Sequence, residues 1–384
     1  MIIKRILHPV GQGAFFSEQF FDENDEAVFN VVYDCGEKRT TKHLVHEIDN
    51  TFALKDKPEV IDVIFISHLD EDHFNGIDYL IKQGCLTEKS VVILPLLYPQ
   101  VVKEILERSR AANGKDSYGM YDCLLSLFDS GAKILGVDDN EEVYPNDPLR
   151  IEKVLSDAEP YTTIKSKQPL QYEGLWCYLP FNTILDDDRY KEFLNALEDK
   201  GIKKDKLSDI NYVKDNILTL KEIYENLPNG IGSVTAINVN SLNVLSYAAK
   251  VLKCQGEWWN YFGHINGWWW PEEVEILSEG RFSCLYTGDC VMESNFNTCL
   301  DFIKQHILPY IGLLQIPHHG RSTCYNKAVV QRKDIRTGFT NFNSTHKANK
   351  FVKQIMHDFS IEGKEFFQIT EHFHSRMEFY MRIG

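Results

Sequence analysis

Four candidate metal ligands, His68, Asp70, Asp72 and His73, lie within six residues of the sequence. Imidazole nitrogens and carboxylate oxygens together suit zinc, manganese or non-haem iron, and they leave a position open for water when the remaining ligands come from distant loops. The alternative is a polar helix cap, in which an aspartate accepts backbone N–H groups and the histidines are merely exposed. Two histidines and two aspartates packed so closely favour the metal site.

Two later segments offer further ligands. Asp289 ends the segment Thr287-Gly288-Asp289, where the glycine permits a tight turn that can point the carboxylate out of a sheet. His318 and His319 follow an apolar stretch and a proline. Adjacent histidines point in different directions, so we expect one of them to bind metal and the other to line the pocket or to hold a partner of the ligands.

Each of these segments follows an apolar stretch that predicts a strand. The stretch 60–66 is almost continuously apolar up to Ser67-His68, which is typical of a strand covered on both faces. Loops at strand ends are where rigid scaffolds display catalytic groups. Further strands are predicted at 2–7, 14–21, 28–33, 233–238, 242–247, 281–286, 311–316 and 337–340, with a helix at 40–52 and a closing hairpin at 366–381.

Two stretches with helical spacing interrupt this pattern, at about 99–138 and 186–227. Neither is flanked by a linker rich in Pro, Gly and Ser, so we interpret both as elaborations on a single domain that spans residues 1–384. A Trp-rich insertion at about 255–272 holds five of the six tryptophans, together with His264, which we interpret as structural. Core packing is the commonest use of tryptophan, and protein interfaces and base stacking are the alternatives.

Composition narrows the class of protein. With 43% apolar and 25% charged residues, the chain of 384 residues is expected to fold. No apolar run approaches the roughly 20 residues of a membrane span, and the N-terminus lacks the features of a signal peptide. Nine cysteines without CxxC spacing indicate reduced thiols, so we expect a cytoplasmic protein and no membrane partner. The net charge of −15 disfavours nonspecific coating of nucleic acid, although it is compatible with a nuclease site that has its own basic rim.

Together the motifs resemble the metallo-β-lactamase superfamily, and within it the hydrolase domain of the competence protein ComEC and its free-standing soluble relatives. Those relatives have HxDxDH where HxHxDH is commoner, and His68 to His73 has the same pattern. The resemblance continues, in the family's order, at Val10-Gly11-Gln12-Gly13, Val32-Tyr33-Asp34-Cys35-Gly36, Asn238-Val239-Asn240-Ser241-Leu242, Thr287-Gly288-Asp289, Pro317-His318-His319-Gly320 and Asn343-Ser344-Thr345-His346. Three positions depart from it: Pro9, Ala14 and Arg321 stand where the relatives usually have two aspartates and a serine. The histidine that the superfamily has before the bridging aspartate has no obvious counterpart.

The resemblance implies an α/β (α+β) fold, a four-layer αββα sandwich with helical insertions, and the alternation of strands and helices agrees with it. It also implies one or two divalent metals, zinc or manganese, with the aspartate-rich set shifting the preference towards manganese. One metal would bind His68, Asp70 and one of His318 and His319. The other would bind Asp72 and His73, and Asp289 would bridge the two.

The resemblance further suggests roles in the reaction. Asp72 is expected to orient the attacking water. His346 would protonate the leaving oxygen or act as a further ligand, with simple exposure as the alternative. Arg321 would clamp a phosphate through its guanidinium, with a plain surface position as the alternative, and Asn240 is assigned to substrate binding.

The favoured function is a metal-dependent hydrolase, a phosphodiesterase or nuclease in which a metal-bound hydroxide attacks DNA, RNA or a nucleotide, because two-metal clamping suits in-line phosphoryl chemistry. The first alternative is hydrolysis of a carboxylic ester, a thioester or a peptide. The second is a binding module that docks a protein partner through the Trp-rich and helical insertions. The complete set of ligand types favours an enzyme over such a module.

Overall fold

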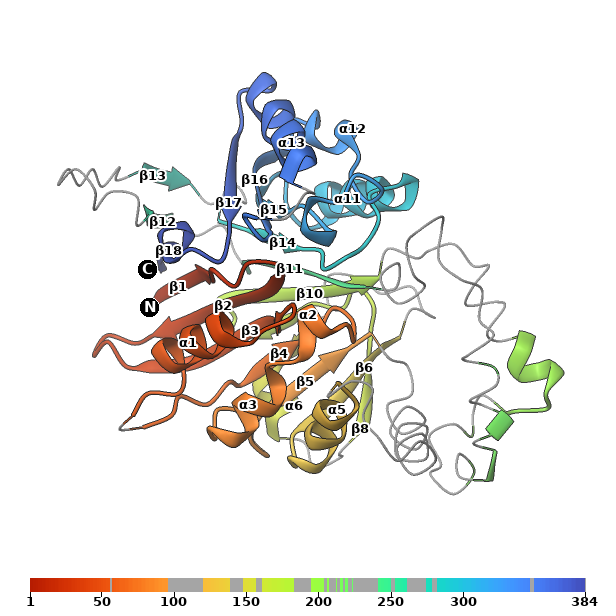
Figure 1. Cartoon of the computed structure of the whole chain (residues 1–384). Coiled ribbons are helices and arrows are strands. Elements are labelled where there is room, and N and C mark those ends of the chain that lie inside the picture. The colour runs from red at the N-terminus through yellow and green to blue at the C-terminus, as the bar shows by residue number, and fades with distance from the viewer. Residues whose placement is uncertain are drawn as a thin grey trace.

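The strands of the computed structural model form two sheets with helices on their outer faces (Figure 1). The structure describes residues 1–55, 57–95, 120–138, 148–156, 161–182, 195–203, 241–249, 253–260, 274–277, 282–345 and 349–383, together with a few positions between 206 and 223. The predicted strand at 233–238, His264, and most of the predicted helical stretch at 186–227 lie outside these residues.

The first sheet has ten strands in the order β13-β12-β18-β1-β2-β3-β4-β5-β6-β8. Neighbours from β3 to β8 run parallel, and the remaining neighbours run antiparallel. The strands are β1 (Ile2–Leu7), β2 (Gly13–Phe21), β3 (Ala27–Glu37), β4 (Val63–Phe65), β5 (Val91–Leu94), β6 (Lys133–Asp138), β8 (Tyr161–Lys165), β12 (Lys253–Asn260), β13 (Val274–Leu277) and β18 (Met377–Ile383).

The second sheet has eight strands in the order β17-β16-β15-β14-β11-β10-β9-β7. Strands β14 to β17 run parallel, so their carboxyl ends meet at one edge of the sheet. The strands are β7 (Leu149–Arg150), β9 (Leu170–Tyr172), β10 (Trp176–Asn182), β11 (Leu242–Ala248), β14 (Cys284–Tyr286), β15 (Ile311–Gln315), β16 (Ile335–Asn341) and β17 (Glu365–Ile369).

Helices cover the outer face of each sheet. One apolar cluster joins the first sheet to α1 (Lys42–Thr51), α2 (Glu71–Phe74), α3 (Ile77–Lys82) and α5 (Met120–Asp129). Another joins the second sheet to α11 (Ser294–His306), α12 (Lys327–Val330) and α13 (Asn349–Ile361). Short helices α6 (Ile151–Ser156), η3 (His318–Gly320) and η4 (Phe373–Ser375) complete the described elements.

A third apolar cluster fills the space between the two sheets. It follows from the two-residue period of strands, which sends successive side chains to opposite faces. In β2, Phe16 packs between the sheets and Phe15 packs under the helices, and in β4 Phe65 and Ile64 divide in the same way. Both faces of these strands are therefore buried. The αββα sandwich expected from the sequence is confirmed, with layers of helices, sheet, sheet and helices.

Several predicted elements differ from the structure. Residues 133–138, expected to be helical, form β6, because they pair in parallel with β5 on one side and with β8 on the other. The closing hairpin expected at 366–381 is also wrong, since β17 and β18 belong to different sheets and the chain crosses between them through η4. Strand β4 is shorter than predicted, covering Val63–Phe65.

The Trp-rich insertion begins as part of the first sheet. Residues 253–260 form β12, which pairs antiparallel with β18 and with β13. The remainder of the insertion up to 272, and the first part of the predicted helical stretch at 99–138, lie outside the described residues. Whether the chain is one domain stays a prediction.

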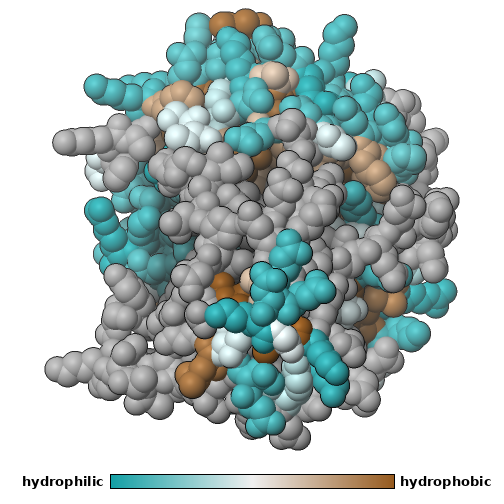
Figure 2. Space-filling view, turned by 90° about the vertical axis from the view of Figure 1, so that its right-hand side faces the viewer, coloured by the Kyte–Doolittle hydropathy of each residue, from teal (hydrophilic) through white to brown (hydrophobic). Residues whose placement is uncertain are grey.

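The described surface has no concentration of large apolar side chains. The exposed ones are scattered over several elements: Val28, Leu54, Leu218, Met356, Ile361 and Phe373. On the face shown in Figure 2, the coloured side chains are mostly hydrophilic, and the hydrophobic ones form small separate groups. Among the described helices, none is long and apolar enough to cross a bilayer.

Candidate metal centre

His68, Asp72 and His73 lie where β4 ends and α2 begins. Asp70 occupies the N-cap position of α2 but makes no capping hydrogen bond through its side chain, so the helix-cap alternative does not describe it. Gly36, at the end of β3, lies directly against α2, where a Cβ atom would be 2.3 Å from the backbone nitrogen of His73. Only glycine fits at this position, and it allows α2 to pack directly against the end of β3. This packing places the side chains of α2 at the edge of the sheet.

Asp289, His318 and His319 come from the second sheet, after β14 and β15. Gly288 has a φ of +54°, and a Cβ there would lie 2.5 Å from Cβ of Ser67, so the loops from the two sheets approach closely at this glycine. His318 and His319 have φ values of +51° and +53°. Left-handed backbone at two successive non-glycine residues costs about 1 to 2 kcal/mol each and is typical of functional sites.

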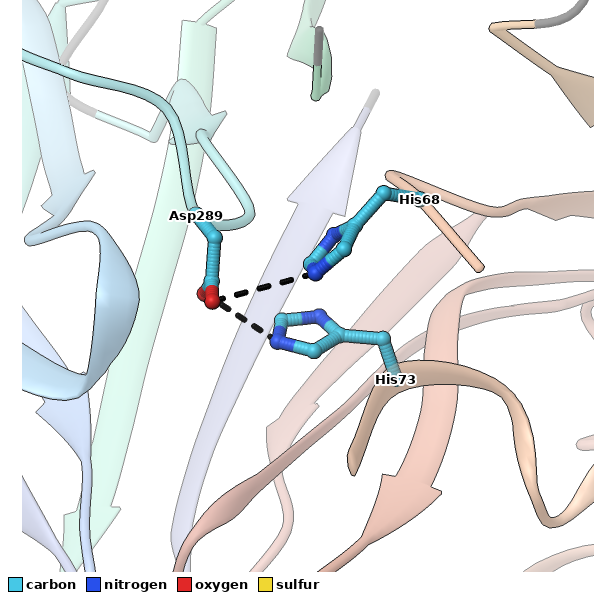
Figure 3. A group of neighbouring side chains, drawn as sticks. All are labelled: His68, His73 and Asp289. Atoms are coloured by element: carbon cyan, nitrogen blue, oxygen red, sulfur yellow. Dashed lines mark ion pairs between the residues drawn. The ribbon is translucent and has the colours of Figure 1, made fainter. Parts of the chain in front are cut away.

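The side chains from the two sheets meet around the carboxylate of Asp289. In Figure 3, the rings of His68 and His73 both point towards this carboxylate from the first sheet. His73 Nε2 lies 3.1 Å from Asp289 Oδ1, and His68 Nε2 lies 3.7 Å from Asp289 Oδ2. The ring centroids of the two histidines are 4.1 Å apart.

One half of the centre lies on the Oδ2 side of Asp289. His318 Nε2 is 3.5 Å from this oxygen, on the same side as His68. The carboxylate of Asp70, whose side chain is 40% exposed, lies 3.6 Å from His68 Nε2 at the outer edge of the group. This half therefore brings two imidazoles and two carboxylates together.

The other half lies on the Oδ1 side of Asp289. His73 Nε2 lies 3.1 Å from this oxygen, and His319 Nε2 lies 4.0 Å from it. Asp72 Oδ2 is 3.2 Å from His319 Nε2. The ligand atoms of Asp72, His73 and His319 all lie within 4.8 Å of one another, and so do those of His68, His73 and Asp289. The two adjacent histidines thus lie in different halves of one centre, with Asp289 between them.

The Nδ1 atoms of the first two histidines are held by neighbouring side chains. His73 Nδ1 is 2.8 Å from Asp34 Oδ2, and His68 Nδ1 is 2.9 Å from Ser67 Oγ. Asp34 also accepts hydrogen bonds from the backbone N–H and the hydroxyl of Ser67, at 2.6 and 2.7 Å. Since a carboxylate can only accept, His73 donates from Nδ1, so Nε2 is the nitrogen that faces the centre.

The later histidines are held in the same manner. His319 Nδ1 is 3.0 Å from the carbonyl oxygen of Asn341, and His318 Nδ1 is 3.3 Å from Cys324 Sγ. The side chain of Asn341 in turn donates to the carbonyl oxygen of His8 at 3.1 Å. These contacts orient each ring so that Nε2 faces Asp289, as expected for metal-binding histidines.

Buried Nε2 atoms test whether a cation fits. Those of His68, His73 and His319 are shielded from solvent, and none makes a hydrogen bond with any part of the chain that the structure describes. Buried polar atoms are normally satisfied, and leaving one without a partner costs about 1 to 3 kcal/mol. Three such nitrogens beside two carboxylates fit a divalent cation as their missing partner.

Electrostatics in the centre reflect the close packing of opposite charges. Burial alone would raise the pKa of Asp289, but the facing ring of His73 holds that pKa well below its usual range. Burial alone would lower the pKa of His73, and the carboxylates of Asp289 and Asp34 outweigh it, raising that pKa. Burial of its ring lowers the pKa of His318 to about 4. A site that favours both ionised carboxylates and a positive charge is suited to a cation.

The remaining predicted site residues lie at the rim of the centre or outside the residues that the structure describes. Arg321 Nη1 is 3.3 Å from His318 Nε2, so its guanidinium lies beside the centre. Asn240 and His346 fall outside the described residues, although Ser241, next to Asn240, accepts a hydrogen bond from the backbone N–H of Asp289 at 3.2 Å. The sequence did not reveal the roles of Asp34 and Cys324. Asp34 stood in a recognised motif, but Cys324 gave no signal.

No family model matches the sequence, and no curated protein matches it either. Among solved structures, the chain is similar to the metallo-β-lactamase fold protein YhfI from Bacillus subtilis, with 12% identity, a TM-score of 0.41 and full coverage of both chains. It is also similar to a mutant of the β-hydroxylase CmlA, with 8% identity, a TM-score of 0.38 and coverage of 98% of this chain and 53% of that one. Unliganded yeast PDE1 has 8% identity and a TM-score of 0.37, with coverage of 99% and 100%. At these values, none of the three assigns a family or an activity to this chain.

Proposed function

We propose that the protein is a metal-dependent hydrolase that cleaves phosphodiesters. One observation carries the proposal: four histidine Nε2 atoms from the two sheets face a single carboxylate, that of Asp289. The proposed cofactor is one or two divalent metals, zinc or manganese. His68, Asp70 and His318 would hold a metal on one side of Asp289, and Asp72, His73 and His319 would hold one on the other.

Bound cations would lower the pKa of a water molecule to about 7 and offset the negative charge of a phosphate. The chain's own residues do the remaining work. Asp72 stays ionised, because the facing ring of His319 outweighs the burial that would raise its pKa. An ionised Asp72 can accept a hydrogen bond from the attacking water and orient it. His346 is the proposed proton donor to the leaving oxygen, and Asn240 is proposed to contact the substrate.

A phosphodiester is favoured over a neutral ester because a guanidinium stands at the rim. Arg321 lies beside His318, where it can donate to two phosphate oxygens. The net charge of −15 opposes binding along a long nucleic acid, so we infer a nucleotide or a short strand as substrate. Hydrolysis of a carboxylic ester, a thioester or a peptide is the second candidate, since the same centre could act on an acyl carbon.

A pure binding role is disfavoured by the buried, converging ligand set, which a docking module does not need. The eight cysteines whose side chains the structure describes are all buried, which supports the inferred cytoplasmic location.

The test combines metal analysis with activity. Protein purified without chelator is expected to contain close to one or two equivalents of zinc or manganese, and Asp289→Asn should lose both metal and activity. Asp301→Asn, which neutralises an exposed carboxylate on α11, is the matched control and should lose neither. Substrates are bis-p-nitrophenyl phosphate, single-stranded DNA and a thioester. Cleavage of the thioester alone would refute the phosphodiesterase, and wild-type protein that binds no divalent metal would refute the hydrolase.

A further inference from the structure

Lys38 stands at the rim of the centre beside Asp72, whereas Arg321 lies beside His318. It follows β3 in the first sheet, and its Nζ atom lies 3.5 Å from Asp72 Oδ2. Its side chain is 41% exposed, whereas that of Asp72 is 7% exposed. An ammonium group therefore sits where solvent meets the buried ligands.

The backbone at Lys38 is fixed from both sides. Its N–H donates to the carbonyl oxygen of Gln12 at 2.8 Å. The preceding residue, Glu37, exchanges two hydrogen bonds with the side chain of Asn75, at 3.0 and 2.7 Å. Asn75 is the C-cap residue of α2, the helix that carries Asp72. The base of the lysine is thus tied to the same helix as the proposed ligands, while its end can move.

The contact with Asp72 does not explain this placement. Charge-assisted N–H···O bonds are typically about 2.7 to 2.9 Å long, so 3.5 Å is a loose pair. Asp72 has a closer partner in His319, at 3.2 Å. Once Asp72 is neutralised by a bound cation, its attraction for the ammonium falls further. Lys38 then remains as a positive charge over the centre with a fixed base and a free end.

Lys38 and Arg321 stand beside different halves of the centre. Lys38 neighbours Asp72, on the Oδ1 side of Asp289, and Arg321 neighbours His318, on the Oδ2 side. If two divalent cations are bound, their four positive charges balance the carboxylates of Asp70, Asp72 and Asp289 and that of Asp34 behind His73, and the two side chains then give a local excess of about two. The entrance to the metal centre would thus be positively charged, although the chain as a whole is acidic.

We propose that Lys38 is a substrate-binding residue, which donates to an anionic oxygen of the substrate phosphate from the Asp72 side while Arg321 donates from the other. This inference rests on the proposed phosphodiesterase function and names its substrate class, a phosphate ester that is held between cations from both sheets. It predicts discrimination against neutral esters, which give the ammonium nothing to bind.

The test compares Lys38→Gln, Lys38→Arg and the control Lys304→Gln, all loaded with manganese. Lys304 is exposed near the end of α11, which returns from the end of β14 to the start of β15, so it lies at the end of the sheet away from the centre. Measurements are metal content, melting temperature, affinity for inorganic phosphate by calorimetry, and KM for bis-p-nitrophenyl phosphate and for p-nitrophenyl acetate.

Lys38→Gln should keep its metal and its melting temperature. Its affinity for phosphate should fall about tenfold, as expected for loss of one hydrogen bond from a charged group, with a matching rise in KM for the diester. Lys38→Arg should recover most of this loss, and both the acetate KM and the Lys304→Gln variant should be unchanged.

Two results would overturn the inference alone: phosphate affinity in Lys38→Gln equal to that of the wild type, or a loss of metal, which would give the lysine a structural role. If metal-loaded wild-type protein neither binds phosphate nor cleaves the diester, the proposed function fails and the inference fails with it. The wild-type measurement therefore separates the two.

Discussion

Asp34 offers the sharpest test of how the centre is organised. It is fully buried, and its carboxylate accepts hydrogen bonds from the backbone of Ser67, from the hydroxyl of Ser67 and from His73 Nδ1, at 2.6, 2.7 and 2.8 Å. Asp34→Asn keeps the shape and removes the charge. Its φ of +56° is one that asparagine adopts readily, so the backbone should not change.

The substitution should reverse the tautomer of His73. The amide oxygen can still accept from the backbone of Ser67, and the hydroxyl of Ser67 can turn to accept from the new NH₂ group. The same NH₂ group can only donate and so cannot accept a hydrogen bond from His73 Nδ1, and the ring must carry its proton on Nε2. That proton then points at Asp289 Oδ1, 3.1 Å away, and occupies the lone pair proposed to bind metal.

The expected losses of metal affinity and of stability follow from these contacts. Losing the outer partner of a metal-binding histidine typically lowers metal affinity about 10- to 100-fold, which corresponds to about 1.4 to 2.7 kcal/mol. In the metal-free protein, one charge-assisted hydrogen bond is lost, and the free energy of unfolding should fall by about 2 kcal/mol. Affinity is measured by competition with a chelator of known strength, and stability by urea unfolding of metal-free protein.

Asp358→Asn is the matched control. Asp358 is also buried, on α13, and its carboxylate binds Lys327 Nζ at 2.9 Å and the hydroxyl of Tyr325 at 3.0 Å. This variant should lose stability and retain its metal affinity. The tautomer argument is refuted if Asp34→Asn binds metal as tightly as the wild type, or if both variants lose affinity equally, which would indicate a general effect of destabilisation.

Three further variants test other parts of the structure. Burial lowers the pKa of His8 from 6.5 to about 4, so the unfolded chain binds more protons than the folded chain between these pH values. The free energy of unfolding should therefore fall by up to about 3 kcal/mol as pH drops through that window. Urea unfolding at pH 7.5 and pH 5 should show a smaller fall in this free energy for His8→Gln than for the wild type. Gly36→Ala places a Cβ 2.3 Å from the backbone nitrogen of His73, so the melting temperature and metal content should both fall, with a cost of at least about 2 kcal/mol; unchanged values would contradict the proposed close packing. Cys324→Ala removes the Sγ atom that lies 3.3 Å from His318 Nδ1, so the absorption spectrum of the cobalt-substituted protein should change. Cys324→Ser should preserve the spectrum. Identical spectra in both variants would show that the thiol does not orient the ring.

Local patterns in the sequence determined much of this protein. The almost continuous apolar stretch 60–66 predicts a strand covered on both faces, because neighbouring side chains must point to opposite sides, and Ile64 and Phe65 of β4 do so. The cluster His68 to His73 after a buried strand predicts a site at the sheet edge. The resemblance carried by these motifs implied four layers, and the two sheets and their helices confirm them.

Tertiary structure alone decided what depends on distant segments. Residues 133–138 have helical spacing, but their pairing partners β5 and β8 make them a strand. The sequence left open which of His318 and His319 is the metal ligand. In the structure both rings face Asp289, and this depends on where Asp289 lies and on the left-handed backbone of the two histidines. The role of Asp34 could not be predicted from the sequence, because it depends on the contact between β3, which carries Asp34, and α2, which carries His73. Local sequence sets which face of an element is apolar, whereas distances between side chains that are hundreds of residues apart arise only when the sheets pack.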